Sequence, residues 1–343
     1  MKSQRNTSAS LIRPLTISLS LVNPNTVPAT ATTVQSTARS HSLLADYAVL
    51  VKPRVSVMVL ITAAAGFYLG SLRSGISPFH IGLVEALFGI AMVTAGSSVL
   101  NQALERTTDL LMPRTLDRPM AQRRISLAHG LTIGFILTFA GSLYLAYTTN
   151  LITGTITLLT AVAYVAVYTP LKRLTTLNTF IGAFPGALPP LIGWTAARGD
   201  IEWPAVALFA ILFVWQFPHF MAIGWMYRRD YASAGIRVTA AQQPTTWAAR
   251  SSVIQALFYA VIMIPASLWP YWLGITGKPY AIAACILGAW YLHSTIRFAG
   301  ILKNPEAPET RVTARQLLKV SVMYLPLLLL AMMLNAQGRL FFQ

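Results

Sequence analysis

Amide and acidic side chains recur at fourfold spacing where a long apolar stretch ends: Asn101, Glu105 and Asp109. At about 100° per residue, these positions cover roughly 80° of one helical face, so their oxygen atoms can converge on one point. Carboxylates near the C-terminus of a helix face the negative end of its dipole, which favours a cation between them. The spacing therefore predicts a metal site.

The composition indicates that this site belongs to a membrane protein, because 55% of the residues are hydrophobic and only 10% are charged. We expect an all-α polytopic membrane protein with nine transmembrane helices, since each of nine apolar stretches approaches the ~20 residues that a bilayer requires. The expected spans are residues 55–72, 81–104, 126–147, 151–168, 178–197, 203–227, 251–273, 280–301 and 315–335. The single cysteine, Cys285, lies inside one span, where a small buried apolar side chain is expected and a disulfide framework is not.

The distribution of positive charge predicts a cytoplasmic N-terminus. In that orientation only four of the 26 Lys and Arg residues fall on the opposite side: Arg73, Arg198, Lys278 and Arg339. This is a strong positive-inside pattern, so the high positive charge is explained by membrane topology. Binding of nucleic acid is not expected, because no basic, aromatic-interleaved soluble domain is present.

The first 45 residues differ from the rest, being rich in Ser, Thr, Asn and Pro and lacking periodicity. We interpret residues 1–45 as a disordered cytoplasmic tail and residues 46–340 as one membrane domain in a bacterial inner (cytoplasmic) membrane. An acid-poor start that contains Arg and Ser also fits a mitochondrial transit peptide, which would place the protein in the mitochondrial inner membrane.

Three expected spans, 81–104, 151–168 and 203–227, end on the cytoplasmic side and bring polar residues to one membrane face. Mg²⁺ prefers such oxygen ligands together with phosphate oxygens. The predicted metal ligands are Asn101, Glu105, Asp109 and Asp230, and the predicted diphosphate-binding residues are Arg114, Arg118, Lys172 and Arg173. A diphosphate ester with an apolar tail is the natural ligand. Metal and cations would stabilise the departing pyrophosphate and leave an allylic carbocation.

Four blocks, at residues 101–119, 168–178, 182–194 and 215–236, resemble the protohaem IX farnesyltransferase family, a branch of the UbiA-type intramembrane prenyltransferases. The third block reads Gly-Ala-Phe-Pro-Gly-Ala-Leu-Pro-Pro-Leu-Ile-Gly-Trp, and the fourth contains Trp-Gln-Phe-Pro-His-Phe and Asp-Tyr-x2-Ala-Gly-Ile. The resemblance covers roughly residues 46–335, in order, and implies a UbiA-type helical bundle.

The resemblance implies transfer of the farnesyl group of farnesyl diphosphate to a vinyl group of haem B, with addition of water, to give haem O and diphosphate. It also implies dependence on Mg²⁺, with haem B a substrate and not a cofactor, and a role in haem O and haem A biosynthesis. Association with haem A synthase or with oxidase assembly is a further expectation. Many relatives carry an Asp-x-Asp pair in the first block, whereas this chain has Glu105 and Thr107, which puts the affinity for metal, or the number of ions, in question.

His219 lies inside the sixth expected span, where ionisable groups usually face a cavity or a partner. Asp230 falls within about 20° of the same face if the helix continues, so one helix would present both side chains. We expect His219 to act beside the haem, either as a ligand of the iron or as a base that assists addition of water. The predicted haem pocket comprises Trp215, His219, Phe220 and Tyr231, and the predicted catalytic residues are Asn101, Glu105, Asp109, His219 and Asp230.

Two alternatives remain at this point. The protein could be another UbiA-type prenyltransferase that acts on an aromatic or chlorin acceptor. It could also be a proton-coupled transporter, whose intramembrane acids and histidines relay protons. The gathering of polar groups on one face favours the enzyme. His129 and His293, the latter within the eighth span, are interpreted as structural residues.

Overall fold

The computed structural model describes residues 42–336, and this part of the chain is helical. Residues 1–41 of the predicted tail, which spans residues 1–45, lie outside the described residues. Helix α1 (Leu43–Leu50) begins directly after, with the Ser42 side chain accepting a hydrogen bond from the Ala45 N–H. Such a cap satisfies one of the free N–H groups at the start of a helix.

Within residues 42–336, nine helices are long and apolar enough to cross a membrane, which confirms the expected number of spans. Six are single helices: α2 (Pro53–Arg73), α3 (Ile81–Asp109), α4 (Leu127–Thr148), α9 (Trp203–Met226), α11 (Thr245–Trp272) and α13 (Glu309–Leu334). Helix α12 (Lys278–Phe298) continues into the 3₁₀ turn Ala299–Leu302. The two others are interrupted: α5 (Leu151–Val162) continues through the π-helical turn Ala163–Tyr168 into α6 (Thr169–Leu171), and α7 (Asn178–Ala187) is followed by α8 (Pro189–Arg198).

The interruption in the fourth span places two tyrosines toward the site. A π-helical turn adds a residue to the helical repeat and therefore shifts the register of the side chains that follow it. Here the turn runs from Ala163 to Tyr168 and contains Tyr164, whose ring stacks on that of Tyr168 with 5.9 Å between the ring centroids. The Tyr164 hydroxyl contacts Asn101 of α3, and the Tyr168 ring lies 4.5 Å from the Lys172 ammonium nitrogen.

Close approach of α2 and α8 joins the first span to the fifth. A Cβ at Gly193 would lie 1.8 Å from the carbonyl oxygen of Ala63, and a Cβ at Gly66 would lie 1.9 Å from that of Pro190. Only glycine permits this backbone contact, as in many helix pairs within membranes. Gly193, in the proline-rich fifth span, thus serves helix packing.

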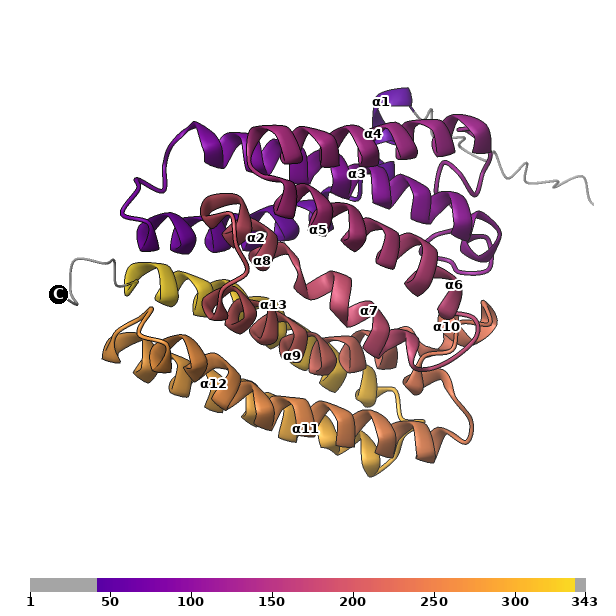
Figure 1. The fold of residues 1–343 in the computed structure, drawn as a ribbon. Coiled ribbons are helices and arrows are strands. Elements are labelled where there is room, and N and C mark those ends of the chain that lie inside the picture. The colour runs from indigo at the N-terminus through magenta and orange to yellow at the C-terminus, as the bar shows by residue number, and fades with distance from the viewer. Residues whose placement is uncertain (1–41, 337–343) are drawn as a thin grey trace, which may run out of the picture. The chain divides into compact units, whose positions relative to one another are not determined.

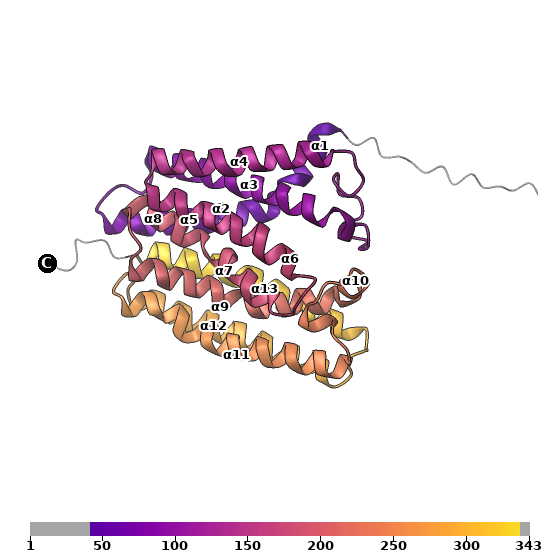
Figure 2. The same cartoon turned by 45° about the vertical axis from the view of Figure 1, so that its right-hand side comes forward.

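Figures 1 and 2 show how the helices are arranged within residues 42–336: α3, α4 and α5 lie on one side, α11 and α12 on the other, and α9 and α13 between them. Helix α9 packs against both α11 and α13. The largest buried apolar cluster surrounds α9 and includes Trp194, Trp225, Tyr291 and Tyr324. This rigid centre fixes α9, from which His219 projects.

The structure corrects two expectations. Helix α9 ends at Met226, and Tyr227 has non-helical backbone angles before the short helix α10 (Arg228–Ser233) begins. His219 and Asp230 therefore do not share a helical face, because the register argument requires an uninterrupted helix. Cys285 is exposed on the surface of α12, not buried, which places a small apolar side chain where lipid is expected.

Candidate active site

Two ion pairs link the acidic end of α3 to neighbouring segments. Lys172, just after α6, donates a hydrogen bond of 2.6 Å from Nζ to Oε1 of Glu105. Arg118, in the loop between α3 and α4, donates from Nη1 to both carboxylate oxygens of Asp109, at 2.7 and 2.8 Å. Arg118 Nη1 also lies 3.8 Å from Oε2 of Glu105. The structure thus brings together four of the predicted site residues.

The loop after α3 folds back to hold Arg118 in this position. The Thr115 hydroxyl donates a hydrogen bond of 2.9 Å to the carbonyl of Asp109, one of the carbonyl groups that a helix leaves free at its end. Arg124, further along the same loop, pairs with Asp46 of α1 at 3.0 Å. The loop is therefore anchored at both ends.

Asn101 lies one turn deeper in α3 and contacts a residue that the sequence analysis missed, Lys52. The Lys52 Nζ donates a hydrogen bond of 2.6 Å to Oδ1 of Asn101, and the Tyr164 hydroxyl donates to the same oxygen at 3.1 Å. The Asn101 amide in turn donates to the Thr169 hydroxyl at 3.0 Å. The predicted metal-ligating oxygen of Asn101 is therefore occupied by a lysine and a tyrosine.

Lys52 precedes Pro53 at the start of a span, where a basic residue is ordinarily interpreted as a positive-inside anchor. Its backbone lies in the left-handed region, with φ of 49°. A lysine in this conformation costs on the order of 1 kcal/mol, and such strained residues concentrate at functional sites. The one sequence signal for Lys52 was its place before a proline, which disfavours helical geometry.

The two lysines of the site, Lys52 and Lys172, differ in the direction in which their pKa is shifted. Burial, together with repulsion by Arg118, lowers the pKa of Lys52 to about 7. Burial alone would lower the pKa of Lys172 too, but the neighbouring Tyr168 and Glu105 side chains outweigh it, so this pKa lies above its ordinary value. Lys172 thus remains a fixed positive charge. With Arg118 it balances the two carboxylates, and a charged Lys52 leaves an excess of positive charge for an anionic ligand.

Arg114, a predicted diphosphate-binding residue, lies on the other side of the loop against α10. Its guanidinium carbon stands 5.3 Å from the centroid of the Tyr227 ring and 5.0 Å from that of Tyr231. A guanidinium held by ring faces keeps its N–H groups available in its own plane. Arg173, in contrast, is exposed next to Lys172 and is not among the residues that contact the carboxylates.

Asp230 lies half-buried on α10. Among residues 42–336 its carboxylate has neither a hydrogen-bond partner nor an ion-pair partner. In the same part of the chain, no three His, Cys, Asp or Glu side chains gather closely enough to hold a metal ion by themselves. The predicted set of metal ligands is therefore divided between α3, where the acids are paired with cations, and α10, where the acid has no partner.

The four predicted haem-pocket residues face two directions. Phe220 and Tyr231 line a small cavity of about 70 Å³ that also reaches Tyr168. Trp215 and His219 instead lie against α13, with their rings stacked at 4.8 Å between centroids. His129 bonds to the Tyr47 hydroxyl, which agrees with a structural role, whereas His293 is exposed on α12 and its structural role stays a prediction.

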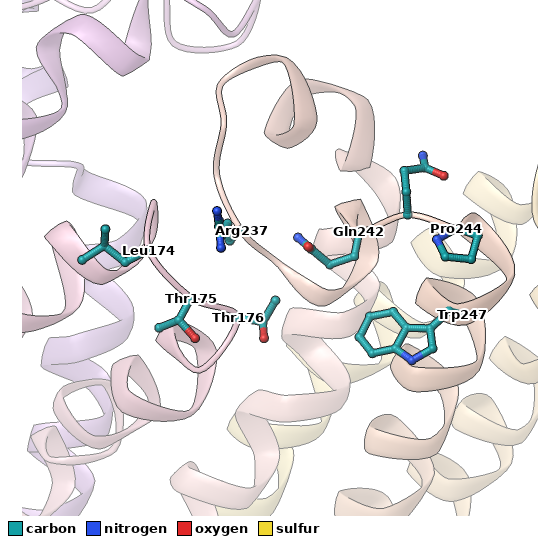
Figure 3. Close-up of a pocket in the computed structure, with 8 residues that line it drawn as sticks. Leu174, Thr175, Thr176, Arg237, Gln242, Pro244 and Trp247 are labelled. Atoms are coloured by element: carbon teal, nitrogen blue, oxygen red, sulfur yellow. The ribbon is translucent and has the colours of Figure 1, made fainter.

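A larger cavity, of about 410 Å³, opens between the loop after α6 and the segment that leads into α11 (Figure 3). Its lining is largely polar and includes Thr175, Arg237 and Gln242, with the indole of Trp247 at one side. The backbone N–H of Arg237 donates a hydrogen bond of 2.7 Å to the backbone carbonyl of Lys172, so the cavity adjoins the ion-pair network. None of the predicted site residues lines it.

Comparison with known proteins identifies the family. Residues 59–315 match the UbiA prenyltransferase family. A protoheme IX farnesyltransferase from Koribacter versatilis is 42% identical over 294 residues, which cover 86% of this chain and 94% of the relative. A protein of the same name from Solibacter usitatus is 38% identical over 301 residues, covering 85% of this chain and 99% of the relative.

Solved structures with the same fold are more distant in sequence. A structure of digeranylgeranylglyceryl phosphate synthase superposes with a TM-score of 0.68 at 19% identity, covering 85% of this chain and 98% of that chain. A UbiA homologue from Archaeoglobus fulgidus bound to GPP and Mg²⁺ superposes with a TM-score of 0.53 at 14% identity, covering 84% of this chain and 99% of that chain. On the sequence match and this shared fold, the chain belongs to the UbiA prenyltransferase family.

Proposed function

We propose that this protein transfers the farnesyl group of farnesyl diphosphate to a vinyl group of haem B, with addition of water, giving haem O and diphosphate. The relatives named protoheme IX farnesyltransferase support this activity at 42% and 38% identity over most of both chains. One structural observation carries the proposal: two carboxylates on α3 and two cations from different segments meet at one end of an apolar helical bundle.

Each of those ion pairs contains one group suited to a metal and one suited to a phosphate. We infer that Glu105 and Asp109 would hold the metal of a magnesium–diphosphate ester, and that Lys172 and Arg118 would hold its phosphate oxygens. The ion pairs keep the four side chains neutralised before the ester binds. Because both kinds of group stand within 4 Å of each other, small rotations of the side chains suffice.

The donor set fits Mg²⁺. Glu105, Asp109 and Asp230 offer carboxylate oxygens, and Mg²⁺ is usually held by one or two carboxylates together with substrate phosphates. Asn101 would add its Oδ1 only after releasing Lys52 and Tyr164. That no three such side chains gather by themselves within residues 42–336 agrees with a metal that is bound jointly with the substrate. The A. fulgidus homologue with GPP and Mg²⁺ supports the same assignment. When bound, the ion supplies Lewis-acid stabilisation of the leaving diphosphate.

The residues of this chain then perform the remaining work of the first step. Lys172, Arg118 and Arg114 stabilise the electron pair that passes to the diphosphate when the bond between farnesyl C1 and oxygen breaks. Arg173, exposed next to Lys172, contributes at the outer rim of this site. Tyr164 and Tyr168 stand beside the site with stacked rings, whose faces favour a neighbouring allylic cation.

In the second step the vinyl group of haem B donates its π electrons to C1 of the farnesyl cation, which forms the new carbon–carbon bond. The positive charge moves to the vinyl carbon next to the porphyrin, where water adds and loses a proton. We assign Trp215, His219, Phe220 and Tyr231 to the haem pocket. Phe220 and Tyr231 line the small cavity next to Tyr168, so this pocket adjoins the proposed diphosphate site.

The active site is proposed to face the cytoplasm of a bacterial inner membrane, with the polytopic bundle in the lipid bilayer. A cysteine that replaces Gln122, in the loop after α3, should react with an impermeant thiol reagent in inside-out vesicles and not in intact cells. The exposed Cys285 is replaced by Ala in this experiment. Labelling only in intact cells would reverse the orientation. Association with haem A synthase remains a separate proposal, tested by co-purification.

Heterologous expression followed by mass spectrometry of extracted haems tests the activity in cells. We expect haem O to accumulate with the wild-type chain and to be absent with Asp109→Ala. Accumulation of a prenylated quinone precursor or chlorin in place of haem O would instead assign the chain to another acceptor. Growth-coupled substrate uptake without any prenylated product would favour a transporter.

A further inference from the structure

A serine on α13 fixes the orientation and the proton of His219. The His219 Nδ1 lies 2.8 Å from the hydroxyl oxygen of Ser321. The same hydroxyl donates its proton to the carbonyl of Leu318, at 2.7 Å. A serine hydroxyl has one proton to donate. With that proton directed to Leu318, the Ser321 oxygen is left to accept from His219, so we assign the imidazole proton to Nδ1.

The second ring nitrogen of His219, Nε2, is consequently the one that carries the lone pair. Among residues 42–336 it has no hydrogen-bond partner, and the residue as a whole is half-buried. The ring is held on one side by the stacked indole of Trp215, whose Nε1 donates 2.8 Å to the backbone carbonyl of Ser321. Ser321 is itself fully buried, so both anchors of the histidine lie on a rigid helix.

This arrangement is the one found around histidines that bind metals. A ligating histidine usually donates its other ring N–H to a fixed acceptor, which sets the tautomer and orients the lone pair. His219 has this geometry, yet no three potential ligands gather in the described part of the chain. A metal that bound this nitrogen would have to bring its other ligands with it, as the iron of a porphyrin does.

We propose that Nε2 of His219 binds the iron of the acceptor haem as an axial ligand, and that Ser321 is a positioning residue that holds this nitrogen ready. The proposal rests on the proposed function for the identity of the acceptor. Ligation of the iron fixes the porphyrin plane relative to α9 and so limits which edge of the macrocycle faces the farnesyl cation.

Haem binding without prenyl donor tests the ligand directly. Ferrous haem B is added to the purified protein, and the iron–histidine stretching band is recorded by resonance Raman spectroscopy. We expect the band with wild type and with His293→Ala, a control in which an exposed histidine of α12 is removed. His219→Ala should lose the band, and added imidazole should restore it. A band that persists in His219→Ala, or that disappears in His293→Ala, would overturn the proposal.

Metal-free protoporphyrin IX separates ligation from simple packing. His219→Ala should weaken binding of haem B by about tenfold or more and leave binding of the metal-free porphyrin within about twofold, because only the former has an iron to ligate. An equal loss for both porphyrins would show that His219 only shapes the pocket.

The role of Ser321 has its own readout. Ser321→Ala removes the hydroxyl and leaves the backbone carbonyl that anchors Trp215, so we expect the iron–histidine band to shift to lower frequency. Ser321→Thr keeps a hydroxyl and should keep the wild-type band. An unshifted band in a folded Ser321→Ala protein would refute the positioning role. If Ser321→Ala does not fold, the iron–histidine band of Ser321→Thr is the test, and a shift of that band in Ser321→Thr counts against the positioning role.

A wild-type protein that shows the iron–histidine band yet never forms haem O would refute the proposed function and leave the ligand assignment standing.

Discussion

Replacement of Lys172 by Met, alone and together with a change at Glu105, should show whether this ion pair serves the stability of the fold, catalysis or both. The side chains of Lys172 and Glu105 are 16% and 15% exposed, and Lys172 Nζ lies 2.6 Å from Glu105 Oε1. Removing one partner of a buried pair costs about 3–5 kcal/mol, and the remaining exposure and the nearby Arg118 reduce this to about 2–3 kcal/mol. For a chain of this length, a loss of that size lowers the midpoint of thermal unfolding by roughly 3–5 °C.

The double variant Lys172→Met/Glu105→Gln should recover most of that stability, because no buried charge is left without a partner. We expect a coupling energy of about 1–3 kcal/mol between the two positions. Activity should not recover: each single variant and the double variant should lose on the order of 100-fold in kcat, since both side chains are assigned to the metal–diphosphate ester.

The assay combines thermal unfolding in detergent with formation of haem O by the same preparations. Restoration of both stability and activity in the double variant would refute the reasoning, because the pair would then serve only to hold the fold together. Additive losses of stability, without coupling, would equally contradict the pairing seen between Lys172 and Glu105.

Two further predictions concern the bundle itself. Gly193→Ala should lower stability by about 3 kcal/mol, because its Cβ would stand 1.8 Å from the Ala63 carbonyl oxygen, whereas Gly288→Ala, with its Cβ 3.4 Å from the nearest side chain, should be neutral in the same thermal assay. At the opposite end of the bundle, hydrogen bonds from Arg198 hold the pKa of Glu202 below its ordinary value of 4.5, so this pair stabilises the fold above that value and loses its effect as the pH falls through the lowered pKa. Glu202→Gln should therefore lower the unfolding midpoint slightly at pH 7 and flatten the decline of that midpoint as the pH falls below about 4.5; an unchanged profile would contradict the pairing.

The spans and the acidic face of α3 could be predicted because each depends on local pattern. Apolar length alone gives nine spans, and the fourfold spacing of Asn101, Glu105 and Asp109 is fixed by the helical repeat. The cations were predicted as residue types suited to diphosphate. Their pairing with individual carboxylates was not, because it depends on how the loop after α3 folds back.

Other features depended on contacts between distant segments. Lys52 was missed because a basic residue at the start of a span has an ordinary explanation, and only the fold brings it to Asn101. Ser321 was missed because a serine within an apolar helix carries no signal of its own. The helical register that joined His219 to Asp230 failed at Tyr227, where the backbone leaves the helix without a proline or glycine to mark it.

The central claim is that the ion-pair network of α3 binds a magnesium–diphosphate ester whose prenyl group is transferred to haem B. The most direct measurement is the stoichiometry of pyrophosphate released and haem O formed by the purified protein supplied with farnesyl diphosphate, haem B and Mg²⁺. We predict one pyrophosphate for each haem O, with both products abolished by chelation of the metal and by Asp109→Ala. Release of pyrophosphate that is independent of haem B, or formation of haem O that persists without Mg²⁺, would contradict the claim.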